Sequence, residues 1–147
     1  MAGRMDDPQR TGRAGGLLDR ADAMVLHAWA ETDPCERLRT AYLAALRGAG
    51  AVLAATGADH APRARSRNAW VLMQQAAPEF VMWADYFSSF SETRAALEAG
   101  LPRAISDTQA DEFAARVEAF LRDVEDALAV TAARLRPASA RVGGGTA

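Results

Sequence analysis

One segment, residues 33–57, limits what this chain can fold into, because it carries a full set of signals for one long helix. Asp33 can accept hydrogen bonds from the free amides of a first helical turn, and Pro34 follows where a missing N–H costs nothing. Glu36 stands three residues after this cap, at capping-box spacing. Gly57 is placed to end the helix in the left-handed conformation. The segment therefore predicts a helix from Pro34 to the residue before Gly57.

Apolar side chains recur at steps of three and four along this helix. They form one stripe, consisting of Leu38, Tyr42, Ala45, Ala49, Val52 and Leu53. Alanine and glycine fill much of the remaining surface, so the helix is thin and other helices can approach it closely. Gly48 and Gly50 each cost about 1 kcal/mol of helix propensity relative to alanine, a loss that close packing can offset. We therefore expect this helix at the centre of a helical bundle.

Helical signals also divide the rest of the chain. The sequence predicts a first helix over residues 17–30, a third capped by Ser66, a fourth opened by Pro78, a short one from Ser91 to Gly100, and a long last one from Ser106 or Asp107. Only Glu31 and Thr32 separate the first helix from Asp33, so the first two helices should be antiparallel neighbours. The sequence shows no alternating pattern typical of strands.

Aromatic residues are concentrated in one stretch. Six of the ten lie between positions 70 and 90, namely Trp70, Phe80, Trp83, Tyr86, Phe87 and Phe90. Aromatic side chains bury the most surface per residue, so this stretch should supply the widest part of the core. Trp83 lies on the stripe with Phe80 and Phe87, and we expect it to be a core anchor whose replacement by alanine costs about 3–5 kcal/mol.

These patterns predict an all-α protein with a single domain. We expect an up-and-down bundle of four long helical segments plus short helices over residues 17–136. The polar, glycine-containing ends, residues 1–16 and 137–147, are predicted to be disordered tails.

Composition excludes several classes of function. The net charge is −2, so no global positive field draws in nucleic acid, although all 17 basic residues are arginine. The single Cys35 excludes an intramolecular disulfide, and the two histidines do not lie in a metal-type cluster. No apolar run has the length of a membrane span and the start lacks a signal-peptide pattern. We therefore expect a cytoplasmic protein without a metal, a cofactor or a membrane partner.

The order of the segments resembles a known family. ERLRTAYLAALRGAGAVLA, a loop, RSRNAWVLMQQAAPEFVMWADYFSSF and a long amphipathic closing helix are together similar to a small bacterial branch of the HEPN (higher eukaryotes and prokaryotes nucleotide-binding) superfamily. The resemblance implies a helical bundle that dimerises. It also implies that the chain is either a metal-independent endoribonuclease or toxin, or a member that has lost catalysis and serves in binding or regulation.

Catalytic members carry an arginine, four to six residues, and then a histidine. The imidazole takes part in proton transfer at the ribose 2′-OH, and the arginine holds the phosphate. Two pairs in this sequence have that spacing: Arg20 with His27, and Arg37 with Tyr42, where tyrosine stands in the place of histidine. Tyrosine is a much weaker base near neutral pH, and arginine is frequent enough here for the first spacing to arise by chance.

Arg63, Arg65 and Arg67 alternate in the loop before the third helix. In an extended backbone all three would project to one side, where they could hold a nucleic-acid phosphate backbone. The alternative is a solvated linker between helices. If nucleic acid binds this chain, we expect these three arginines to hold it.

Two hypotheses of function follow. The favoured one is a homodimeric HEPN-like module that binds a protein, RNA or nucleotide-containing partner, or regulates it, without catalysis. The alternative is a metal-independent HEPN endoribonuclease or toxin of a toxin–antitoxin type system, acting through Arg20 and His27.

Overall fold

The computed structural model describes residues 8–60 and 68–134, and this part of the chain is helical without strands. Its α-helices are α1 (Pro8–Ala30), α2 (Pro34–Thr56), α3 (Ala69–Ala76), α4 (Val81–Ser88), α5 (Ser91–Glu98) and α6 (Asp107–Arg134). Two short 3-10 helices, η1 (Ala58–His60) and η3 (Pro78–Phe80), follow α2 and precede α4. The predicted all-α class is confirmed.

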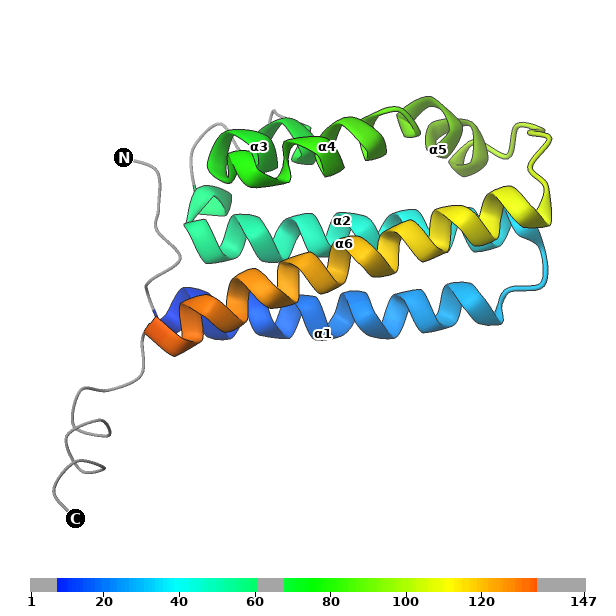
Figure 1. The fold of residues 1–147 in the computed structure, drawn as a ribbon. Coiled ribbons are helices and arrows are strands. Elements are labelled where there is room, and N and C mark those ends of the chain that lie inside the picture. Colours follow the sequence, from blue (N-terminus) through cyan, green and yellow to red (C-terminus); the bar gives the residue numbers. More distant parts are fainter. Residues whose placement is uncertain (1–7, 61–67, 135–147) are drawn as a thin grey trace, which may run out of the picture.

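The helices form an up-and-down bundle in which α2 is central. In Figure 1, α1, α2 and α6 lie side by side as three long rods, while α3, α4 and α5 follow one another in a row above them. Helix α2 packs against α1, α6, α3 and α5, as its thin, alanine-rich surface predicts. The separate helices predicted between Ser66 and Gly100 are thus present as three short helices of eight residues each.

The predicted caps of the two best-marked helices are present. The Asp33 side chain accepts from the Glu36 N–H at 3.0 Å, and Gly57 ends α2 in the left-handed region with φ 78°. At the start of α6, the Gln109 N–H donates to Ser106 Oγ at 3.1 Å, and the Ser106 N–H donates to Gln109 Oε1 at 2.9 Å. This reciprocal pair is the capping box expected from the sequence.

Helix α1 begins earlier than predicted. Residues 8–16, which we expected in a disordered tail, are helical. Ala14 is fully buried in the bundle, and Arg13 forms an ion pair with Asp59 of η1 at 3.1 Å. These tertiary contacts stabilise a glycine-containing turn whose own helix propensity is poor. The predicted C-terminal tail, residues 137–147, lies outside the described residues.

The start of α3 also differs from the prediction. Asn68 is its N-cap, accepting from the Trp70 N–H at 2.8 Å, whereas Ser66 lies outside the described residues. Ala77 leaves the helical conformation before Pro78, with φ −142° and ψ 83°, so α3 ends there and η3 leads into α4. Proline therefore divides this row of helices where the sequence predicted a break.

Trp70, rather than Trp83, is the aromatic anchor of the core. Trp70 is 1% exposed and stacks against Phe87, whereas Trp83 is only partly buried and donates its indole N–H to Asp123 at 2.7 Å. The prediction that Trp83 is a core anchor is therefore wrong. The periodicity identified the right face of α4, but Trp83 lies at its edge, where its polar N–H can reach a carboxylate on α6.

Gly48 is the point of closest approach between α2 and α6. A Cβ atom added there would lie 2.6 Å from Leu121 Cδ2 and 2.8 Å from Phe120 Cε2, and both neighbours are buried. The same addition at Gly50 meets nothing within 4 Å. The helix interface thus requires glycine at position 48 but not at position 50.

We expect opposite effects from the two alanine substitutions. Gly50→Ala should stabilise the protein by about 0.5–1 kcal/mol, because alanine restricts the unfolded chain and favours the helix. Gly48→Ala gains the same propensity but forces the α6 side chains to move, which costs about 1–3 kcal/mol. Urea denaturation of both variants measures this difference, and equal stabilisation by both would contradict the close approach at Gly48.

Candidate functional site

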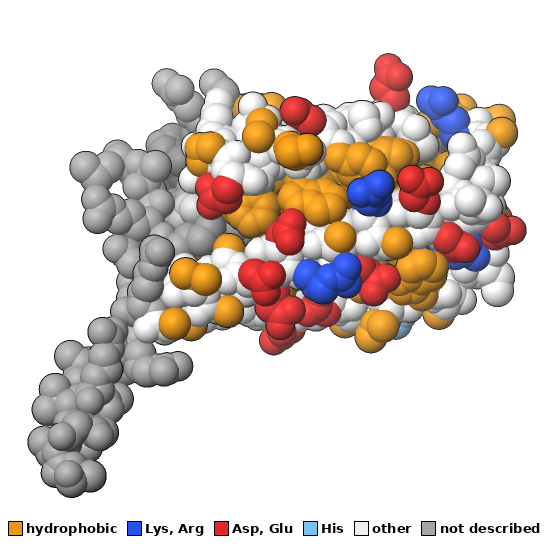
Figure 2. All heavy atoms as spheres, in the orientation of Figure 1, with side chains coloured by type: hydrophobic (Ala, Val, Ile, Leu, Met, Phe, Trp, Pro, Cys, Tyr) orange, Lys and Arg blue, Asp and Glu red, His pale blue; other side chains and the backbone are white. Residues whose placement is uncertain are grey.

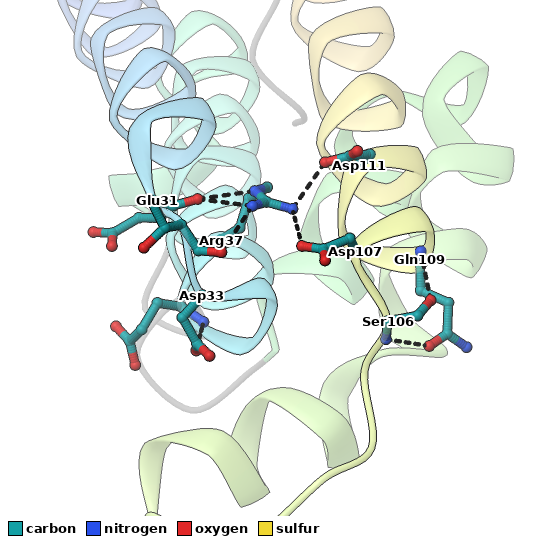
Figure 3. Close-up of polar contacts among 9 residues, drawn as sticks. Glu31, Asp33, Arg37, Ser106, Asp107, Gln109 and Asp111 are labelled. Carbon is teal, nitrogen blue, oxygen red and sulfur yellow. Dashed lines mark hydrogen bonds and ion pairs between the residues drawn. The ribbon is translucent and has the colours of Figure 1, made fainter.

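Arg37, the arginine of the predicted Arg37–Tyr42 pair, lies in the first turn of α2 and is 8% exposed. Its Nε and Nη2 donate to the Glu31 carbonyl oxygen at 3.1 and 2.9 Å, and Nη2 also donates to the Thr32 carbonyl oxygen at 3.2 Å. Its Nη1 donates to Asp111 at 2.9 Å and to Asp107 at 3.3 Å. Figure 3 shows the guanidinium held between the α1–α2 link and the first turn of α6.

These contacts occupy the whole donor capacity of the side chain. A guanidinium has five N–H donors, and Arg37 makes five hydrogen bonds within the chain. Two carboxylates of α6 balance its charge. In this arrangement Arg37 has no donor left for a substrate phosphate, and it instead ties the end of α1 to the start of α6.

Tyr42 lies in the core, only 3% exposed. Its hydroxyl accepts from the indole N–H of Trp70 at 2.9 Å, and its ring stacks on Phe113 with centroids 6.2 Å apart. It lies five positions after Arg37, so the two side chains leave α2 about 140° apart around the helix axis. The structure therefore does not bring Arg37 and Tyr42 together.

Arg20 and His27, the other predicted pair, are both exposed on α1. Seven residues place them about 10 Å apart along the axis and on one side of the helix. Neither side chain makes a hydrogen bond or an ion pair with the described residues. This pair is open to solvent, but no further group from the described part of the same chain completes a site around it.

The predicted nucleic-acid arginines, Arg63, Arg65 and Arg67, lie outside the described residues. Their segment joins η1 to Asn68, the cap of α3. Where these three side chains lie relative to each other therefore stays a prediction.

A cleft of about 570 Å³ opens between α5, the loop before α6, and the first turns of α6. Phe113 and the half-buried Tyr86 and Phe90 line it, and Arg103 and Glu112 supply one charge of each sign. Burial raises the pKa of the Tyr86 phenol above its ordinary value; Arg116 opposes the rise and Glu112 adds to it. The Tyr86 phenol therefore stays protonated near neutral pH, so it can donate a hydrogen bond in this cleft and does not act as a base.

Hydrophobic side chains also reach the surface. Figure 2 shows them as a band below the row of α3 to α5, with isolated basic and acidic side chains around it. The large exposed apolar residues include Met82 on α4 at 81% and Leu26 on α1 at 69%. Trp29, 39% exposed, donates its indole N–H to Glu118 of α6 at 2.7 Å.

Two kinds of feature are absent from the described residues: a metal-type cluster and a membrane-spanning helix. Within them, no group of three or more His, Cys, Asp or Glu side chains is arranged to hold a metal ion. None of their helices is both long enough and apolar enough to span a membrane. Cys35 is free, with its thiol 3.6 Å from the carbonyl oxygen of Arg103.

Sequence reasoning did not find the partners of Arg37. Asp107 and Asp111 were visible as acids at the start of α6, where the helix dipole alone accounts for them. Their four-residue spacing places both on one side of that helix, and this was the only signal that one basic group could bridge them. Which arginine does so depends on the packing of α2 against α6.

Comparison with known proteins gives one family match. The family model for the SAV_6107-like HEPN domain matches residues 28–125, from the end of α1 into the last third of α6. Arg37 and Tyr42 lie within the matched residues, whereas Arg20 and His27 precede them. No curated protein and no solved structure matches the chain significantly.

Proposed function

The chain belongs to the SAV_6107-like HEPN family, and we propose that it is a dimerising module that binds or regulates a partner without catalysis. The partner would be a protein, an RNA or another molecule that contains a nucleotide. The observation that carries this proposal is the use of Arg37: all five of its N–H donors hold the fold together.

The chemistry of RNA cleavage supports the same conclusion. Without a metal, cleavage needs a base of near-neutral pKa at the ribose 2′-OH and a cation at the phosphate. Within the family match, the tyrosine at the spacing of the base is Tyr42, which is buried and accepts a hydrogen bond from Trp70. A buried phenol and a saturated guanidinium on different sides of α2 do not supply these two functions.

A second function, a metal-independent HEPN ribonuclease or toxin, is favoured by one observation. Arg20 and His27 are both exposed on one side of α1, so a second copy could bring another such pair opposite them. A composite site of this kind would supply an imidazole and a guanidinium from each chain.

Purified protein should leave single-stranded and structured RNA intact in the presence of a chelator. The physical reason is that, within the described part of one chain, the fold does not hold a histidine and an arginine together around a binding site. RNA integrity on denaturing gels is the measurement. Cleavage that persists in chelator, and is lost in both His27→Ala and Arg20→Ala while the helical circular dichroism spectrum is kept, would establish the ribonuclease instead.

The protein should behave as a symmetric dimer. Exposed Leu26, Met82 and Trp29 give the surface apolar area that a second copy could cover. Light scattering after size exclusion at micromolar concentrations should give twice the mass of one chain. Met82→Arg and Leu26→Arg can locate the interface, since only a substitution within it should yield monomers. A monomeric mass for the unmodified protein would contradict the proposal.

A further inference from the structure

A second cavity, of about 240 Å³, opens where the start of α3 and the start of α5 meet the middle of α2. Its polar lining consists of Tyr42, Asn68, Ser91 and Arg94, and Trp70 adds an aromatic wall. Among the described residues that line the cavity, Arg94 is the one charged residue and none is a carboxylate. Of the candidate site residues predicted from the sequence, Tyr42 lines this cavity, whereas Arg20, His27 and Arg37 do not.

Arg94 is half-buried and lacks the partners that a buried guanidinium nitrogen normally has. It makes no ion pair with the described residues, and its Nε is buried without a hydrogen-bond acceptor. Its guanidinium carbon lies 5.7 Å from the centroid of the Tyr42 ring, a cation–π contact that fixes the side chain without neutralising it. A buried polar group without a partner in a native fold calls for an explanation, and a bound ion is one.

The oxygens of Asn68 and Tyr42 already accept hydrogen bonds within the fold, so these polar groups face the cavity mainly with donors. Asn68 uses its carbonyl oxygen to accept from the Trp70 N–H, which leaves its amide group free to donate. Tyr42 oxygen accepts from the Trp70 indole, so the phenol hydrogen is available to Ser91 Oγ, 3.5 Å away. Either hydroxyl can donate in this contact, and when the phenol does so the hydroxyl hydrogen of Ser91 is free to donate into the cavity.

We propose that this cavity binds the phosphoryl group of inorganic phosphate or of a small phosphate ester. Arg94, Asn68 and Ser91 offer only donors here, and they come from two different elements around one opening, an arrangement that suits a tetrahedral oxyanion with several acceptor oxygens. The cavity is smaller than the roughly 300–1,000 Å³ of sites for drug-sized ligands, so it fits the anionic group rather than a whole nucleotide. The site lies within one chain and requires neither dimerisation nor catalysis, so it goes beyond the function proposed above.

Titration calorimetry with inorganic phosphate, at constant ionic strength, tests this site. We expect saturable binding of one phosphate per chain, with acetate binding more weakly. Arg94→Gln should weaken phosphate binding at least about tenfold, because glutamine removes the positive charge and its charge-assisted hydrogen bonds to the anion. Arg103→Gln, which removes an arginine of the larger cleft instead, is the matched control and should bind phosphate as the unmodified chain does.

Asn68→Asp gives an independent variant that preserves the fold. Aspartate can still accept from the Trp70 N–H and cap α3, but it removes the amide donor and adds a negative charge beside the ligand. It should reduce phosphate binding as strongly as Arg94→Gln while the thermal unfolding midpoint changes little.

Three results would overturn the proposal: no saturable phosphate binding, binding that both Arg94→Gln and Asn68→Asp leave unchanged, or acetate binding as tight as that of phosphate. Cleavage of RNA, or a monomeric mass, would contradict the proposed function and leave this binding measurement unaffected. The two ideas can therefore fail separately.

Discussion

Replacing Trp70 with alanine should lower the free energy of unfolding by about 3–5 kcal/mol, the largest effect we expect from any single substitution in the core. Trp70 is 1% exposed, stacks on Phe87 with ring centroids 4.8 Å apart, and donates its indole N–H to Tyr42. Alanine would leave a cavity between α2, α4 and α6 and remove the donor to a buried hydroxyl. Chemical denaturation followed by circular dichroism measures the loss.

Trp83→Ala is the matched control for this prediction. Trp83 is partly buried at the edge of the same aromatic cluster, and its hydrogen bond to Asp123 is exposed. Its loss should cost about 1–2 kcal/mol, since less apolar area returns to water. A larger loss for Trp83→Ala than for Trp70→Ala would show that the core is centred on α4 rather than on the start of α3.

Trp70→Phe separates packing from hydrogen bonding at the same position. Phenylalanine keeps an aromatic ring against Phe87 but cannot donate to the Tyr42 hydroxyl. Trp70→Phe should lower the free energy of unfolding by roughly 1–3 kcal/mol, which is less than Trp70→Ala does. This smaller loss reflects the missing hydrogen-bond donor and the smaller ring.

Arg37→Met should lower the free energy of unfolding by about 2–4 kcal/mol, the second large effect. Methionine keeps much of the apolar stem but leaves the carbonyl oxygens of Glu31 and Thr32 without their donor. It also separates Asp107 and Asp111 from the cation that joins α6 to the α1–α2 link. The two ion pairs contribute only modestly to this loss, because the side chains of Asp107 and Asp111 are 74% and 52% exposed and water partly screens them.

Arg39→Met is the control two residues along α2. Arg39 is 31% exposed and pairs with Glu36 and Glu98 at the surface, so its loss should cost less than about 1 kcal/mol. If Arg37→Met and Arg39→Met were equally mild, the five hydrogen bonds of Arg37 would not be important for stability. Arg37 would then be available for another role, and the main support for a non-catalytic module would be lost.

The sequence alone determined the features that depend on neighbouring residues. Asp33, Gly57, Ser106 and Gln109 define helix ends through hydrogen bonds and backbone conformations that span a few positions, and all four have the predicted roles. The apolar periodicity likewise predicted the all-α class, and the thin, alanine-rich surface of α2 predicted its central place. These signals are local, so a single chain shows them without knowledge of its packing.

The sequence could not decide what depends on contacts between distant segments. Residues 8–16 are helical because Ala14 and Arg13 contact α2 and η1, although their glycines disfavour a helix. Trp70 and Trp83 both lie on helical stripes, and only the packing of the helices against one another determines that Trp70 is enclosed while Trp83 is partly buried.

The candidate site shows most clearly which features local sequence signals determine and which depend on tertiary contacts. Sequence spacing pairs Arg37 with Tyr42, but the turn of α2 directs Arg37 to the acids of α6 and Tyr42 to Trp70. A hydrogen-bond donor is available to a ligand only if the fold has not already used it. Arg37 has used all of its donors, partly on Asp107 and Asp111, which lie 70 and 74 positions away in the sequence. Arg94 Nε has no acceptor among the described residues. Only the tertiary structure reveals this difference, because it depends on which distant segments pack together.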